Sequence, residues 1–104
     1  MRWHWSIAAV FALSCAPSED EIKAEFADYV ASRKACSMDD DCVLASIECP
    51  LGCGIAVARE HQSDVEKKAR ELVDDYESGG QGCDYDCAAL MAVCEAGRCE
   101  ETPQ

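Results

Sequence analysis

The chain has 104 residues with 21 acidic and 9 basic side chains, which give a net charge of −12 at pH 7. This length accommodates one domain. The negative charge disfavours nucleic acids and anionic lipid headgroups as partners and suits a basic protein or cations. Nine cysteines in so short a chain are typical of a disulfide-stapled protein that matures outside the reducing cytosol.

Residues 1–14 have the features of an export signal peptide. Arg2 supplies a positive charge, and the run from Trp3 to Leu13 carries no carboxylate and is followed by the small residue Ser14. The run is much shorter than the ~20 apolar residues that a membrane-spanning helix needs. We therefore expect this segment to be removed on export; a buried N-terminal helix is the alternative.

The end of this segment, Ala12-Leu13-Ser14-Cys15, resembles the lipobox of bacterial lipoproteins, where a dedicated signal peptidase cuts immediately before a cysteine. The family prefers leucine where this chain has Ala12. The resemblance implies that Cys15 carries a diacylglycerol and, on its new amino group, an acyl chain such as palmitate. Such a set of acyl chains anchors a protein stably to a membrane. Because Ala16 follows the cysteine, the resemblance also implies the outer membrane in an organism that has one.

Cysteine parity supports the same interpretation, because nine thiols cannot all pair within one chain. If Cys15 is lipidated, an even set of eight remains for disulfides. The alternative is ordinary cleavage after Ser14, which leaves Cys15 free for an intermolecular disulfide. The eight remaining cysteines are Cys36, Cys42, Cys49, Cys53, Cys83, Cys87, Cys94 and Cys99.

The first predicted element is a helix over about Glu19 to Lys34. Together with the lipidated Cys15 it makes up the N-terminal segment 15–35, which precedes the eight-cysteine domain. Ser18 and Glu21 fit a capping box, in which each side chain accepts a hydrogen bond from the other residue's backbone amide. An apolar stripe follows at helical spacing and is expected to face the core. Its members are Ile22, Phe26, Tyr29 and Val30.

The eight-cysteine domain, residues 36–104, begins with a predicted turn at 37–41 and a strand over 42–48. The strand is rich in apolar and β-branched residues, and Pro50 and Gly52 interrupt the chain directly after it.

A second helix is predicted over about 56–77, and its end is marked by the glycines of segment 78–80, which accept the left-handed conformation of a helix C-terminus. Asp64 and Lys68 have the spacing of an ion pair within this helix. Residues 88–93 are predicted to form a second strand, with a helix as the alternative. The fold class is therefore α+β: a small disulfide-rich domain with two helices packed on a short antiparallel two-stranded ribbon.

The spacing of the eight cysteines is nearly a mirror image, with gaps of 5, 6 and 3, then 29, then 3, 6 and 4 residues. Partners chosen from the outside inward have residue numbers that sum to 135 or 136, as directly opposed residues in antiparallel segments do. Local pairing, such as Cys36 with Cys42 and Cys94 with Cys99, is the alternative. The mirror predicts the nested disulfides Cys36–Cys99, Cys42–Cys94, Cys49–Cys87 and Cys53–Cys83.

No catalytic or cofactor motif stands out in the sequence, so no catalytic residue, cofactor or metal ligand is expected. The C-x2-C spacing of zinc and thioredoxin-type sites is missing. The acidic run 39–41, with Asp84 and Asp86, is read as a solvated turn, and a weak calcium site is the alternative. His61 is expected at the surface.

These observations predict a non-enzymatic accessory or binding domain, anchored in the cell envelope through Cys15. A small protease inhibitor that presents Pro50-Leu51-Gly52 between two cysteines is the first alternative, because rigid loops are preorganised for binding. A metal-binding protein is the second.

Overall fold

The computed structural model describes residues 16–80, 82–84 and 86–104. The predicted signal peptide and Cys15 lie outside these residues. Among the described residues, no helix has the length and apolar character needed to span a membrane.

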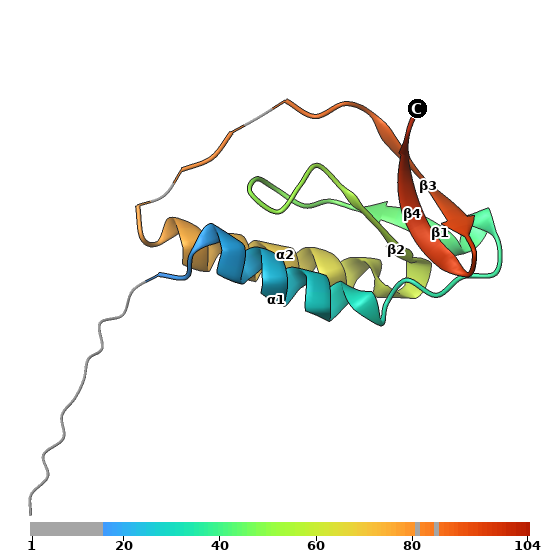
Figure 1. Ribbon diagram of the computed structural model, residues 1–104, viewed down its shortest axis with the longest axis horizontal. Coiled ribbons are helices and arrows are strands. Elements are labelled where there is room, and N and C mark those ends of the chain that lie inside the picture. Colours follow the sequence, from blue (N-terminus) through green and yellow to red (C-terminus); the bar gives the residue numbers. More distant parts are fainter. Residues whose placement is uncertain (1–15, 81, 85) are drawn as a thin grey trace, which may run out of the picture.

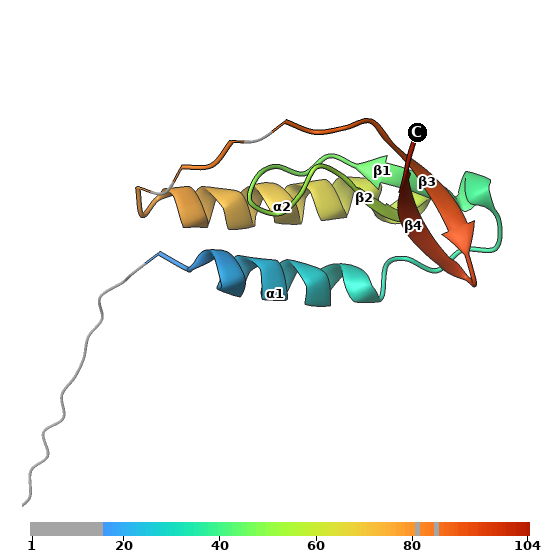
Figure 2. The same cartoon turned by 45° about the horizontal axis from the view of Figure 1, so that its top comes forward.

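Two helices, α1 (Glu19–Ala31) and α2 (Gln62–Glu77), lie side by side and run antiparallel (Figure 2). The predicted capping box is confirmed, because the Ser18 hydroxyl accepts from the Glu21 amide at 3.1 Å and the Glu21 carboxylate accepts from the Ser18 amide at 2.8 Å. The helix does not reach Lys34 as predicted. Its chain leaves helical geometry after Ala31 because residues 34–36 pair with residues 97–99, at the last hairpin turn and the start of the last strand.

The first sheet is an antiparallel pair, β1 (Cys42–Ala45) and β2 (Ile55–Ala58), in which Cys42 lies opposite Ala58. The predicted strand over 42–48 is therefore real but shorter. The predicted helix over 56–77 is wrong at its start, because residues 55–58 form β2 and a short 3-10 helix, η2 (Arg59–His61), precedes α2.

The second sheet is the hairpin of β3 (Leu90–Glu95) and β4 (Arg98–Pro103), which confirms a strand in the region 88–93. Its two-residue turn has positive φ at both positions, 51° at Ala96 and 81° at Gly97. This is the geometry of the tight turns that match the twist of paired strands. The predicted turn at 37–41 contains a 3-10 helix, η1 (Asp39–Asp41).

The α+β disulfide-rich class is confirmed, but the single predicted ribbon is replaced by two separate two-stranded sheets. Each predicted strand pairs with its own near neighbour in sequence, and the β3–β4 hairpin packs across one end of β1–β2 (Figure 1). The main core lies between the helices and the first sheet. It contains Ile22, Phe26, Val30, Ala45, Val57, Val65, Ala69, Leu72 and Tyr76.

All eight predicted cysteines form disulfides, but every nested pair is wrong. Cys36–Cys94 and Cys42–Cys99 replace Cys36–Cys99 and Cys42–Cys94, while Cys49–Cys83 and Cys53–Cys87 replace Cys49–Cys87 and Cys53–Cys83. The local alternative, with Cys36 bonded to Cys42, is wrong as well.

The physical reason for this pairing is that the two cysteine-rich segments do not form one ladder with each other. The chain at Cys36 pairs with the hairpin turn, where its amide donates to the Gly97 carbonyl at 3.0 Å. Cys94 is near this turn and bonds to Cys36, while the fully buried Cys99 bonds to the buried Cys42. The symmetric spacing of the cysteines therefore does not reflect strand pairing between the two cysteine-rich segments.

The segment between α2 and β3 is held to the loop before β2 by the other two disulfides. In Figures 1 and 2 the described parts of this segment, residues 78–80, 82–84 and 86–89, return along the molecule on the side of that loop. Its described residues are exposed to solvent. Its two covalent links, Cys49–Cys83 and Cys53–Cys87, each join residues 34 positions apart in sequence.

Candidate functional site

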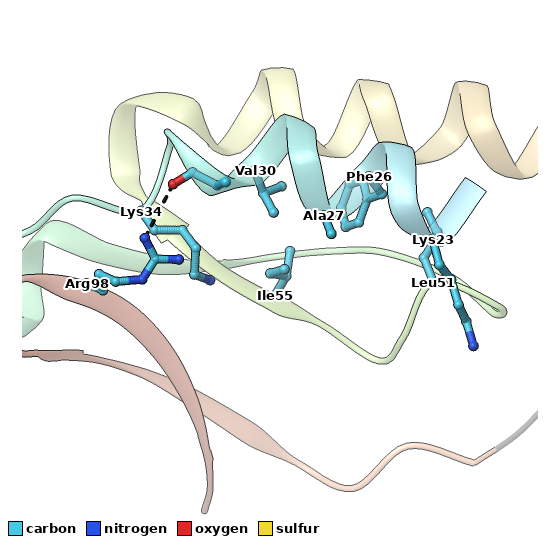
Figure 3. Close-up of a pocket in the computed structure, with 9 residues that line it drawn as sticks. Lys23, Phe26, Ala27, Val30, Lys34, Leu51, Ile55 and Arg98 are labelled. Carbon is cyan, nitrogen blue, oxygen red and sulfur yellow. Dashed lines mark hydrogen bonds between the residues drawn. The ribbon is translucent and has the colours of Figure 1, made fainter. Parts of the chain in front are cut away.

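A groove of about 420 Å³ lies between α1 and the chain that leads into β2 (Figure 3). This volume falls in the range of about 300–1,000 Å³ that small-molecule sites occupy. The residues that line the groove are Lys23, Phe26, Ala27, Val30, Ala31, Lys34, Leu51, Ile55 and Arg98.

The apolar part of the groove follows from the spacing of side chains on α1. Phe26 and Val30 are four positions apart and share one face of the helix. Ala27 and Ala31 beside them are small and exposed, so the helix surface is hollow there. Ile55 and Leu51 form the opposite wall (Figure 3).

The loop that carries Leu51 is fixed on both sides by the disulfides of Cys49 and Cys53. Pro50 between them is buried, and its peptide bond with Cys49 is cis. Leu51 is partly buried and packs against the main core. The groove wall is therefore held by covalent links and core contacts.

One end of the groove carries two basic side chains, Lys34 and Arg98 (Figure 3). Lys34 is only 7% exposed, and its ammonium group donates to the Ala56 carbonyl at 2.5 Å. The nearest carboxylate, that of Glu101, is 3.6 Å away and also accepts from the Ala56 amide at 2.8 Å. The ammonium group of Lys34 is thus held in place by its hydrogen bond to the Ala56 carbonyl. The carboxylate that it faces, that of Glu101, is shared between Lys34 and the Ala56 amide.

Arg98 is exposed, and its polar contacts are long. One terminal nitrogen donates to the Ala31 carbonyl at 3.4 Å, and Nε lies 3.9 Å from the Glu100 carboxylate. At the other end of the groove, Lys23 has a close ion pair, 2.6 Å, with Glu19. Because a guanidinium has five N–H donors, Arg98 keeps more capacity for an incoming anion than its two long contacts use.

This arrangement suits the binding of a ligand. Among the described residues, the nine that line the groove include no carboxylate, cysteine, serine, threonine or histidine. An apolar channel with a basic end is complementary to a ligand with an apolar body and one anionic group. The groove therefore differs from the whole chain, whose field is negative.

The acidic residues considered as a calcium site do not assemble into one. The Asp39 carboxylate accepts from the Cys94 amide at 2.7 Å, and the Asp41 carboxylate accepts from the Ser37 amide at 2.7 Å. In the described part of the chain, no cluster of three carboxylates includes them with Asp84 or Asp86. Asp39 and Asp41 instead fix the backbone around η1.

Three sulfur atoms, those of Cys36, Cys42 and Cys94, lie within 4.8 Å of one another. They come together because the disulfides Cys36–Cys94 and Cys42–Cys99 are neighbours. The thiolate is the form of cysteine that binds metal, and disulfide sulfurs are not thiolates. In this oxidised form the cluster consists of two neighbouring disulfides that cross-link the chain, and it offers no thiolate ligand.

The groove was not predictable from the sequence. Its walls come from α1, from the loop at Leu51 and from Arg98 on β4, which are brought together only by the tertiary fold. The one signal in the sequence was the pair of alanines, Ala27 and Ala31, beside the apolar stripe. His61, expected at the surface, is partly buried at the start of α2 and does not line the groove.

Comparison with known proteins adds no relative: no family model, no curated protein and no solved structure matches this chain. The class that the fold and the groove define is thus a small disulfide-stapled α+β domain with an apolar, basic-ended groove.

Proposed function

We propose that this protein is an exported lipoprotein, anchored to a cell-envelope membrane through acyl chains on Cys15, and that its folded part is a small binding domain without enzymatic activity. The observation that carries the proposal is the cysteine pairing. Eight of the nine cysteines form four disulfides, which are compatible with an extracytoplasmic location. The ninth is Cys15, at the one position that resembles a lipidation site.

The contact at Ala16 supports an orientation for the anchored domain. A Cβ placed on Gly79 would lie 2.6 Å from the Cβ of Ala16, so the start of the described chain lies directly against the end of α2. Cys15 precedes Ala16, and a lipid on it attaches the domain by this end. The groove then opens along α1, with Lys23 nearer the membrane and Arg98 farther from it.

Substitution of the lipid acceptor tests the anchor. We expect the wild-type protein in the membrane fraction with acyl mass on its N-terminal cysteine, and no acyl mass on Cys15→Ser, because the substitution removes the sulfur that takes the lipid. Mass spectrometry of the wild type should show acylation and the loss of eight thiol hydrogens. Ser14→Ala is the matched control: it keeps a small residue before the cysteine and should stay in the membrane fraction.

The anchor proposal fails if the wild type lacks acyl mass, or if Cys15→Ser carries the same acyl mass as the wild type. The protease-inhibitor alternative draws no support from the loop at Pro50, because Pro50 is buried and the partly buried Leu51 packs against the core.

A further inference from the structure

We infer that the groove binds a single-chain alkyl carboxylate, with the carboxylate at Arg98 and Lys34 and the alkyl chain along Phe26, Val30, Leu51 and Ile55. This inference rests on the proposed binding function and names its ligand class.

The position of the headgroup follows from the two basic ends of the groove. Lys23 at one end has a carboxylate of the chain itself at 2.6 Å. At the other end, the carboxylates nearest to Lys34 and Arg98 are at 3.6 Å and 3.9 Å. A ligand carboxylate is therefore better accommodated at the second end, where the guanidinium of Arg98 offers bidentate geometry.

The alkyl chain follows from the floor of the groove. Phe26 is 3% exposed and Val30 is 4% exposed, so their side chains form a firmly packed apolar floor. Ala27 and Ala31 leave the space above it open. The groove, of about 420 Å³, has room for a single flexible alkyl chain.

Charge also favours this ligand over two other possible occupants of the groove, a second copy of the chain and a basic peptide. A second copy of the chain brings another net charge of −12, and the two copies repel each other. A basic peptide, which suits the overall field, meets Lys34 and Arg98 at the end of this groove. A small anion with an apolar tail carries a single negative charge, so the net charge of the protein repels it far less than a second copy, and its carboxylate is complementary to Lys34 and Arg98.

Calorimetric titration of the full chain carrying Cys15→Ser, oxidised and without detergent, tests the inference. The probes are octanoate, decanoate, dodecanoate and tetradecanoate, each below its micelle concentration. We expect affinity to rise about fourfold for each added methylene, the equivalent of ~0.8 kcal/mol, until the groove is full, and then to level off. Dodecanol should bind about tenfold more weakly than dodecanoate, because it lacks the charge that Arg98 and Lys34 recognise.

Two pairs of variants locate the site. Arg98→Gln should weaken dodecanoate about tenfold and leave dodecanol unchanged, while Arg70→Gln, an exposed arginine of α2 that does not line the groove, should change neither. Ala27→Phe should abolish binding of both ligands by filling the groove. Ala24→Phe makes the same change at an exposed position of α1 outside the groove and should bind normally.

The inference is overturned if dodecanoate does not bind, if Arg98→Gln and Arg70→Gln weaken it equally, or if Ala27→Phe binds like Ala24→Phe. Binding to phosphatidylglycerol vesicles without binding to free dodecanoate would assign the groove to a membrane surface and also overturn it. Because every titration uses Cys15→Ser protein, these outcomes are independent of the membrane fractionation that tests the anchor.

Discussion

At the scale of single residues, Lys68 joins the two helices. Its ammonium group lies 2.7 Å from the Glu25 carboxylate of α1 and 5.5 Å from the centre of the Tyr29 ring. The hydrogen bond to Glu25 raises the pKa of Lys68 above its ordinary value and outweighs burial, which lowers it. The ion pair with Asp64 predicted from helical spacing is therefore replaced by one between helices.

Removing this carboxylate gives the first prediction at this scale. Glu25→Gln should lower the free energy of unfolding by about 0.5 kcal/mol at pH 7, a typical value for an ion pair near the surface. Because the pKa of Lys68 is raised on folding, this contribution is complete below the pKa of an unfolded lysine and is lost as the pH rises through the raised value.

Urea unfolding of the wild type and Glu25→Gln at neutral pH and at about pH 11, above the pKa of an ordinary lysine, measures this difference. The deficit of Glu25→Gln should be smaller at the alkaline pH. Glu60→Gln, an exposed carboxylate in η2, is the control and should show no comparable loss. A Glu25→Gln deficit that grows with pH would contradict the assigned pairing.

At the scale of elements, the start of α1 depends on its cap. Ser18 and Glu21 exchange two hydrogen bonds that satisfy amides without partners inside the helix. Ser18→Ala should lower the free energy of unfolding by about 1 kcal/mol. Ser63→Ala, an exposed serine in the first turn of α2, removes a hydroxyl without a cap bond and should cost much less. Thermal or urea unfolding compares the two, and equal losses would exclude a cap-specific effect.

The same elements show what local sequence can and cannot predict. The cap and the apolar stripe of α1 are local, so its existence and start were predictable. Its end at Ala31 and the strand at Ile55–Ala58 were not. Ala58 donates its amide to the Arg33 carbonyl at 2.9 Å, and the Lys34 carbonyl accepts from Cys99 at 2.7 Å. These long-range bonds override the helix preference of the alanines in β2.

At the scale of the whole molecule, the number of disulfides was predictable and their partners were not. Composition and parity assign eight cysteines to four bridges, but connectivity depends on which strands pair. Here each sheet is formed by near neighbours in sequence, β1 with β2 and β3 with β4. The groove depends on the same packing, because Leu51 and Arg98 reach α1 only when both sheets are in place.

The four bridges differ in solvent access, and this predicts the order in which they open. Thiol–disulfide exchange requires access to a sulfur atom. Cys53, Cys83 and Cys87 are exposed, whereas Cys42 and Cys99 are buried.

With limiting reductant, Cys49–Cys83 and Cys53–Cys87 should open first and Cys42–Cys99 last, and alkylation followed by peptide mapping identifies each. Opening either exposed bridge should cost about 2–4 kcal/mol of stability. It also releases the loop of Leu51, so the partly reduced protein should bind dodecanoate more weakly while its helical circular dichroism persists, since the helices pack on the core and not on this loop alone. Early alkylation of Cys42 or Cys99 would show that this burial does not govern reduction.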